Sequence, residues 1–329
     1  MKKFTGLLFV VLLSVVFVFS TNLPVFAGEK VLKIASVTLV GTHHDDFCRF
    51  FAKNVTEAGV GLKVQVISGT PLGNAPQTMD QVIQGTPAMI GNDMAWVAPF
   101  DDDLKILNFG YAFRGPEHQK IFFESSLFGE ITERIRTKHG LRVLAALPAQ
   151  ARLIYSKKPI KSIEDVKRLK IRVPQIKAWV ETWKAFGSTP TPLSFHEVYM
   201  ALNTGVIEAA GGQASPSYQY KYHKAAKYIT DPGHIIPASF IAINDKVFQS
   251  LSQKQQDVVA KEATITMEWA FEDATANADE SIKKMVAEGA EVTLVDKSGF
   301  IKAAIEASGR LEAEGLWSAG LYEKIQAIK

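Results

Sequence analysis

The chain has 329 residues, of which 47% are apolar and 22% are charged. These proportions are typical of a folded globular protein and exclude long disordered or low-complexity segments. At about 150 residues per domain, the length favours two domains or lobes. The formal net charge of +3 falls to +1 without residues 1–27, which hold Lys2 and Lys3 and no acid. A protein so close to neutral has no overall field to gather polyanions, which argues against nucleic-acid binding.

Residues 1–27 have the pattern of a secretory signal peptide. Lys2 and Lys3 precede an apolar stretch over residues 7–19, and Val25-Phe26-Ala27 places small residues where a signal peptidase reads. The alternative is an uncleaved membrane anchor, but this apolar stretch is short against the ~20 residues that a span needs. We therefore expect cleavage after Ala27 and a soluble protein exported to the periplasm.

Strand and helix signals alternate along the rest of the chain. This alternation predicts an α/β fold whose sheets are covered on both faces. The expected strands lie at 31–37, 62–67, 87–91, 141–146 and 152–155, and the first expected helices at 46–58 and 75–84.

The segment from Ser252 to Glu288 predicts one long helix. Ser252 and Gln255 form a capping box, Gly289 is a stop signal, and neither Pro nor Gly lies between them. An unbroken helix of this length spans ~54 Å at about 1.5 Å per residue, which is longer than one small domain. It would cross from one lobe to the other; the alternative is two helices with an unmarked break.

Several polar clusters resemble catalytic or metal sites without meeting their requirements. His43-His44-Asp45-Asp46 contains ligand types, but adjacent residues of a helix point in different directions, so a first-turn Asp pair is the better interpretation. Asp101-Asp102-Asp103 lacks the spacing of a calcium loop and predicts a solvated turn. Cys48 shares a helical face with Phe51, which favours a core cysteine over a nucleophile that uses His43 or His44.

No sequence motif assembles a nucleophile, a base and an orienting partner. The chain contains no GxSxG, HExxH, Walker or GxGxxG motif. We therefore expect a protein that is not an enzyme and needs no cofactor.

Two segments carry a family resemblance. Residues 158–174, ending in Lys170-Ile-Arg-Val-Pro174, and residues 193–208, beginning Leu193-Ser-Phe-His-Glu197, resemble successive signatures of the solute-binding proteins of TRAP (tripartite ATP-independent periplasmic) transporters, the DctP-like family. Shorter matches in the expected order extend the resemblance over nearly the whole mature chain.

The resemblance implies a two-lobed periplasmic binding protein fold with a long helix crossing both lobes. It places residues 28–149 and 238–277 in one lobe, and 150–237 and 278–329 in the other. The ligand site is expected in the cleft between the lobes.

The resemblance also assigns ligand-binding residues. Arg172 falls where relatives grip the substrate carboxylate, a task that suits the bidentate guanidinium fork. Arg152 matches a second pocket arginine, and Phe195 an aromatic that packs on the ligand. From the sequence alone, Arg172 could equally be a strand arginine paired with a nearby acid, and Phe195 the first apolar residue of its helix.

One segment departs from the family pattern. Relatives that bind sialic acid or simple dicarboxylates often carry Gln-Glu-Asn where this chain has Ala210-Gly211-Gly212. A polar contact is therefore missing at Gly212, and Gln213 or Ser215 could replace it. Weaker site candidates are Asn74 and Asn92, the latter followed by Asp93. Trp96, Trp179 and Tyr218 could extend an aromatic wall, although each is more often core or rim.

The function implied by the resemblance is that of an extracytoplasmic receptor. It would bind a small organic acid and deliver it to an integral membrane TRAP permease. The alternative is a secreted ligand sensor that docks on a membrane receptor, with the same pocket and a different partner.

Overall fold

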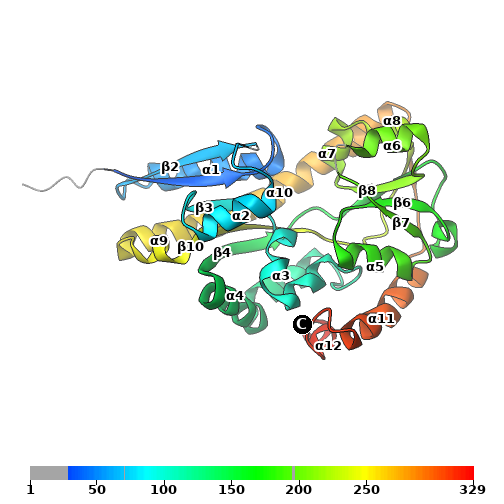
Figure 1. Cartoon of the computed structure of the whole chain (residues 1–329). Coiled ribbons are helices and arrows are strands. Elements are labelled where there is room, and N and C mark those ends of the chain that lie inside the picture. The colour runs from blue at the N-terminus through cyan, green and yellow to red at the C-terminus, as the bar shows by residue number, and fades with distance from the viewer. Residues whose placement is uncertain (1–28, 70, 195–196) are drawn as a thin grey trace, which may run out of the picture.

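The computed structural model describes residues 29–69, 71–194 and 197–329. The expected signal peptide and Phe195 therefore lie outside the described residues. The described chain forms an α/β protein with two separate sheets, each accompanied by helices, as Figure 1 shows. The α/β prediction is confirmed.

The first sheet has five strands in the order β2-β1-β3-β10-β4. β1 runs parallel to β2 and β3, whereas β10 pairs antiparallel with β3 and β4. The strands are β1 (Lys30–Ser36), β2 (Leu62–Ser68), β3 (Met89–Asp93), β4 (Leu141–Pro148) and β10 (Ala238–Asn244). The expected strands in this sheet are thus present, with their ends displaced by one or two residues.

The second sheet has six strands in the order β11-β9-β5-β8-β6-β7. Its central strands β5, β8 and β6 place their residues side by side, with Leu153 opposite Gly212 and Arg172 opposite Ala210. The strands are β5 (Leu153–Ser156), β6 (Lys170–Val173), β7 (Thr189–Pro192), β8 (Ala209–Gly212), β9 (Tyr228–Thr230) and β11 (Glu291–Thr293).

Helices cover both sheets. Those associated with the first sheet are α1 (His43–Glu57), α2 (Ala75–Ile83), α3 (Pro116–Glu124), α4 (Ser126–His139) and α9 (Asp245–Gln249). The remaining helices other than α10 are α5 (Lys177–Ala185), α6 (Val198–Thr204), α7 (Ala214–Gln219), α8 (Tyr222–Ala225), α11 (Ser298–Ala313) and α12 (Leu321–Ala327). Helix α1 begins at His43, three residues before the expected start, and buries Cys48 in the core as predicted.

The long helix is unbroken. Helix α10 spans Gln253–Ala287, and the side chain of Ser252 accepts a hydrogen bond from Gln255 N in the predicted capping box. Its first half packs Val259 and Met267 into the core of the first sheet, and its second half packs Ala278 and Met285 into the core of the second. Helix α10 therefore passes from one sheet to the other (Figure 1).

The two parts of the molecule are also joined away from α10. Gly110 N donates to Thr182 Oγ1 at 2.9 Å, and Tyr111 N donates to His234 O at 2.7 Å. Arg114 donates to the carbonyls of Gln326 and Ile328, which ties the C-terminal end to the segment before α3. The C-terminal segment thus contacts a region that we assigned to the first lobe, and the lobe boundaries stay a prediction.

The Asp101-Asp102-Asp103 cluster is a structural ion-pair site. Arg134 forms ion pairs with both Asp101 and Asp103. Asp103 is buried, whereas we expected a solvated turn. No helix among the described residues is long and apolar enough to cross a membrane.

Candidate functional site

Arg172 is held in a fixed orientation on strand β6. Its side chain is buried, and its Nε and Nη2 atoms donate to the Leu193 carbonyl at 3.0 and 2.8 Å. Burial and the positive charge of Arg152 lower the pKa of Arg172 to about 10, so the guanidinium stays charged at neutral pH. The two bonds fix the plane of the guanidinium, which is the preorganisation that bidentate carboxylate recognition needs.

Arg152 lies beside Arg172, just before strand β5. Its Nη2 donates to the Gly211 carbonyl at 2.9 Å, and its guanidinium carbon lies 4.5 Å from the centre of the Trp179 ring. The buried Nε atom has no hydrogen-bond partner within the described chain. Burial lowers the pKa of Arg152, and the charge of Asp93 partly opposes that shift. Two neighbouring guanidinium groups, that of Arg172 buried and that of Arg152 half-buried, create a positive potential that favours an anionic ligand.

Buried tyrosines surround the two arginines. Tyr155 and Tyr222 are fully buried with their rings edge to face at 5.8 Å, and burial raises the pKa of both phenols. The charge of Arg152 acts on both phenols, and that of Arg172 on Tyr222. Neutral phenols can donate or accept hydrogen bonds beside the two cations. Neither tyrosine was among the residues expected from the sequence.

The backbone of β8 approaches this cluster closely at Gly212. A Cβ atom added to Gly212 would lie 2.2 Å from Ser217 Oγ and 3.4 Å from Tyr222 Cε2. No side chain fits at position 212 without displacing Ser217. The hydroxyl of Ser217 therefore occupies the direction in which a polar side chain of residue 212 would project.

The two asparagine candidates have different surroundings. Asn74 is exposed and serves as the N-cap of α2, where its side chain accepts from Gln77 N at 3.1 Å. Asn92 is buried at the end of β3, and its Oδ1 accepts from Asp93 N at 2.8 Å. Asp93 accepts from Ala95 N, and burial raises its pKa while the charge of Arg152 opposes this. Of these residues, Asp93 is the one whose charge is coupled to an arginine of the site.

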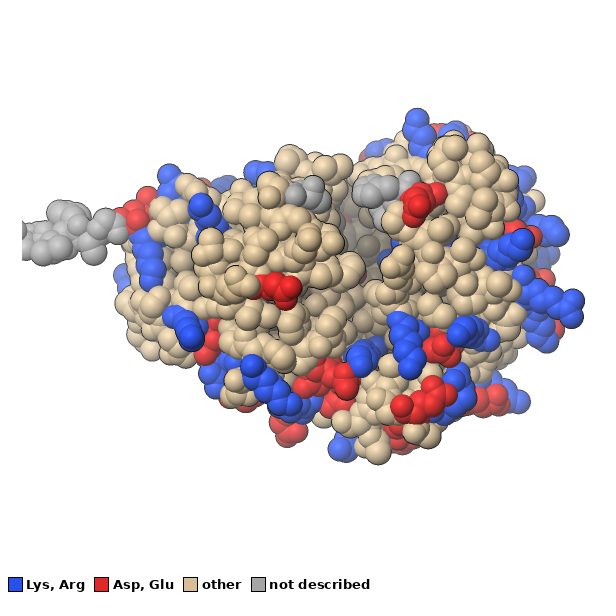
Figure 2. All heavy atoms as spheres, viewed as in Figure 1, with Lys and Arg blue, Asp and Glu red and all other residues tan. Residues whose placement is uncertain are grey.

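A polar pocket of about 220 Å³ lies between the two parts of the molecule. Gln213 and Ser215 line it from the start of α7, His43 and Asp46 from α1, and Asp273 from the middle of α10. Gln150 joins the pocket to the arginine region, because its Oε1 accepts from Ala214 N at 3.1 Å. Figure 2 shows a hollow between the part that carries the first sheet and the part that carries the second.

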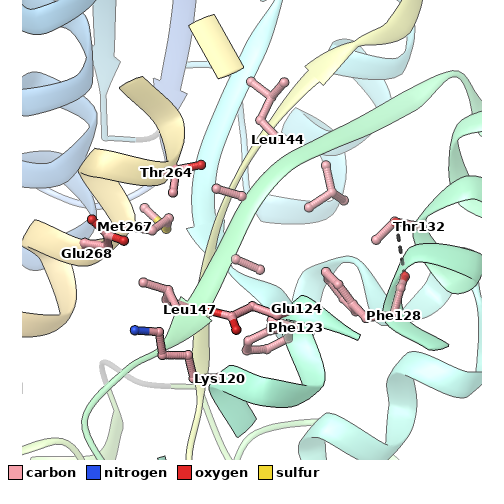
Figure 3. Close-up of a pocket in the computed structure, with 13 residues that line it drawn as sticks. Lys120, Phe123, Glu124, Phe128, Thr132, Leu144, Leu147, Thr264, Met267 and Glu268 are labelled. Atoms are coloured by element: carbon pink, nitrogen blue, oxygen red, sulfur yellow. Dashed lines mark hydrogen bonds between the residues drawn. The ribbon is translucent and has the colours of Figure 1, made fainter. Parts of the chain in front are cut away.

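A second pocket of similar volume is confined to the first part of the molecule. It lies between α3, α4, strand β4 and α10, and Phe123, Phe128, Leu144 and Met267 give it an apolar lining (Figure 3). None of the residues that line it comes from the second sheet or its helices. It is therefore separate from the arginine cluster and is not the candidate site.

The sequence matches a known family over most of its length. Residues 37–313 match the family described as bacterial extracellular solute-binding protein, family 7, also called DctP. The chain belongs to this family, as the two segments around Arg172 and Leu193 predicted.

Curated relatives and solved structures agree with this assignment. The chain is 25% identical over 277 residues to the sialic acid-binding periplasmic protein SiaP of Vibrio cholerae, covering 83% of this chain and 85% of that protein. It is 27% identical over 259 residues to the ectoine-binding periplasmic protein TeaA of Halomonas elongata, covering 77% and 75%.

Two solved structures share its fold closely. An open, ligand-free TRAP periplasmic solute-binding protein of Escherichia fergusonii matches with a TM-score of 0.84 and 25% identity, covering 91% of this chain and all of that one. One from Pseudomonas putida F1, with bound D-glucuronate, matches with a TM-score of 0.80 and 26% identity, covering 91% and 97%. The chain therefore has the TRAP solute-binding protein fold.

Proposed function

We propose that this protein binds a small organic acid in the hollow between its two sheets and delivers it to the membrane permease of a TRAP transporter. The observation that carries the proposal is the pair of neighbouring arginines at the centre of the described site, of which Arg172 is buried and Arg152 is half-buried with a buried Nε atom. Carboxylates lose their hydration on entering a closed cleft, and a guanidinium pair restores much of that loss.

In the proposed mechanism, Arg172 grips the carboxylate and Arg152 supports it. The Leu193 carbonyl orients Arg172 and the Trp179 ring supports Arg152, so neither guanidinium reorganises when the ligand arrives. Phe195, outside the described residues, is proposed to pack on the ligand, and Gln213 or Ser215 to replace the polar contact that is missing at Gly212. Asn92 and Asn74 stay weaker candidates.

The names of the relatives support an acid as the ligand. The protein of Pseudomonas putida F1 holds D-glucuronate, and the relative of Vibrio cholerae is named for sialic acid. Both ligands carry a carboxylate, which is the group that an arginine pair recognises. We infer that the ligand is released unchanged, without catalysis, and that export to the periplasm follows cleavage after Ala27.

Native mass spectrometry of the protein purified from its own periplasm tests the ligand class. We expect a co-purified carboxylic acid, and its transfer to vesicles that contain the permease would establish the transport role. A full-length protein retained in the membrane would contradict cleavage. Chemical change of the bound acid by the purified protein would contradict a binding role.

A further inference from the structure

The polar pocket between α1, α7 and α10 has a lining that the carboxylate function does not explain. The acidic residues among those that line it are Asp46 and Asp273, and none of the described residues that line it is Lys or Arg. A pocket for the anionic end of a ligand would have the opposite charge. The lining therefore fits a group with positive charge.

The two carboxylates repel each other across the pocket. Burial raises the pKa of Asp46, and the negative charges of Asp45 and Asp273 raise it further. The Asp46 carboxylate has no hydrogen-bond partner or ion pair in the described chain, although Arg49 lies near enough to act on it. Asp273 accepts one hydrogen bond, from Asn277 Nδ2 at 2.8 Å. A bound cation would relieve the repulsion between the two acids.

A third group in the pocket adds an acceptor. The buried Nδ1 atom of His43 has no hydrogen-bond partner among the described residues, while its Nε2 lies 3.4 Å from Ser239 Oγ. Burial lowers the pKa of His43 to about 4, so the ring is neutral at pH 7. If Nε2 carries the ring proton, Nδ1 is an acceptor. A protonated nitrogen donates to all three of these groups, whereas a carboxylate donates to none.

The size of the pocket favours an organic cation over a metal ion. A volume of about 220 Å³ exceeds what a bare ion fills, and the described residues include no group of three His, Cys, Asp or Glu arranged for a metal. The pocket adjoins the arginine region through Gln150 and Gln213. A ligand with a carboxylate at one end and a cationic nitrogen at the other would place the carboxylate against the arginines and the nitrogen against Asp46 and Asp273.

We propose that the pocket of His43, Asp46 and Asp273 binds a cationic nitrogen group, so that the ligand of this protein is a zwitterion rather than a simple anion. The cation could instead belong to a separate molecule, and the test distinguishes these sources. That the ligand also carries a carboxylate rests on the proposed function, whereas the binding of a cationic nitrogen rests on the pocket alone.

The test compares three matched series of probes by calorimetry at pH 7 and at concentrations up to 10 mM. These are the ω-aminoalkanoates from glycine to 6-aminohexanoate, the alkanoates of the same lengths, and the alkylamines. The variants are Asp273→Asn and Asp46→Asn, with Asp279→Asn as control. Asp279 is exposed on the same helix and is not among the residues that line the pocket, so its substitution makes the same charge change elsewhere.

We expect an aminoalkanoate of at least one length to bind at least tenfold more tightly than its alkanoate. Asp273→Asn and Asp46→Asn should reduce this advantage to below threefold, and Asp279→Asn should leave it unchanged. Because Asp46 lies in the first turn of α1, circular dichroism must confirm that its variant folds, and Asp273→Asn tests the same pocket from another helix. Alkylamine binding as tight as that of the aminoalkanoate, and lost in both variants, would establish the pocket with a separate cation.

Three results would overturn the proposal: equal binding of alkanoates and aminoalkanoates at every length, an advantage that survives both substitutions, or no binding of any amine-bearing probe. Failure of the proposed function would give a different experimental result. That failure would appear as alkanoate binding that Arg172→Ala does not weaken.

Discussion

The hydroxyl of Ser217 lies where a side chain of residue 212 would begin, because a Cβ atom on Gly212 would be only 2.2 Å from Ser217 Oγ. Gly212 of β8 has no side chain, and the hydroxyl of Ser217 from α7 occupies the space beside it. This pairing explains physically why position 212 is glycine in this chain. It also makes the two residues interdependent.

We expect Gly212→Ala to lower the free energy of unfolding by about 1–3 kcal/mol, because the added methyl group overpacks the site. In a Ser217→Ala background the next contacts, at 3.4 and 3.5 Å, are ordinary, so the same change should cost less than about 1 kcal/mol. Urea denaturation of the four proteins in this double-mutant cycle measures the coupling. Equal costs of Gly212→Ala in both backgrounds would contradict the steric account.

The buried His234 should make the protein less stable in acid. Its side chain is 1% exposed, neither ring nitrogen has a hydrogen-bond partner in the described chain, and burial lowers its pKa to about 3 from 6.5. Between pH 6.5 and pH 3, His234 is therefore protonated in the unfolded chain and neutral in the folded protein. The stability should fall as the pH drops from 6.5 toward 3, with a loss of about 2 kcal/mol between pH 7 and pH 5.

The variant His234→Phe isolates this contribution. A phenyl ring can keep the edge-to-face contact with Trp183 and does not titrate. Urea denaturation at pH 7 and pH 5 should show a difference between the two pH values that is about 2 kcal/mol smaller than in the wild type. An unchanged difference would show that His234 is not the group responsible.

Ligand binding should close the hollow between the two parts of the molecule. A ligand that contacts both parts makes all its contacts only in the closed state, so it shifts the population toward that state. Small-angle X-ray scattering with saturating ligand should therefore give a smaller radius of gyration than the ligand-free protein. An unchanged radius would argue against closure.

Trp179 should support ligand binding through Arg152. Replacing Trp179 by Leu removes the ring beside the guanidinium and the hydrogen bond from Nε1 to Asn108. We expect the affinity for the ligand to fall about 3- to 30-fold, in line with a cation–π contact of about 0.5–2 kcal/mol. Trp179→Phe keeps an aromatic face and should lose less, as calorimetry can determine. Wild-type affinity in the Leu variant would remove Trp179 from the account.

The sequence was informative where the signal is local. The capping box at Ser252 and the absence of Pro and Gly predicted α10, because helix formation depends on neighbours along the chain. The burial of Cys48 followed from its spacing to Phe51. Arg172 was found through a resemblance over a contiguous segment, and the structure places it in a buried cluster.

The remaining contacts join residues that are distant in the sequence. Tyr222 lies near the arginines and Ser217 beside Gly212 because α7 and α8 fold back on β8. Asp273 and His43, which act on each other in the pocket, are 230 residues apart in the sequence. No periodicity or motif records such pairings. The ion pairs of Arg134 with Asp101 and Asp103, which replace the expected solvated turn, are missed for the same reason.

Calorimetry of Arg172 variants with the identified acid tests the central claim most directly. Removing the arginine leaves the carboxylate buried without its partner, which typically costs 2–5 kcal/mol, or about 30- to several thousand-fold in affinity. Arg172→Lys keeps a charge but loses the planar fork and should still bind clearly worse than the wild type, while Arg152→Ala should weaken binding less than Arg172→Ala. With folding verified by circular dichroism, the account predicts at least a 30-fold loss for Arg172→Ala, and affinity within about threefold of the wild type would contradict it.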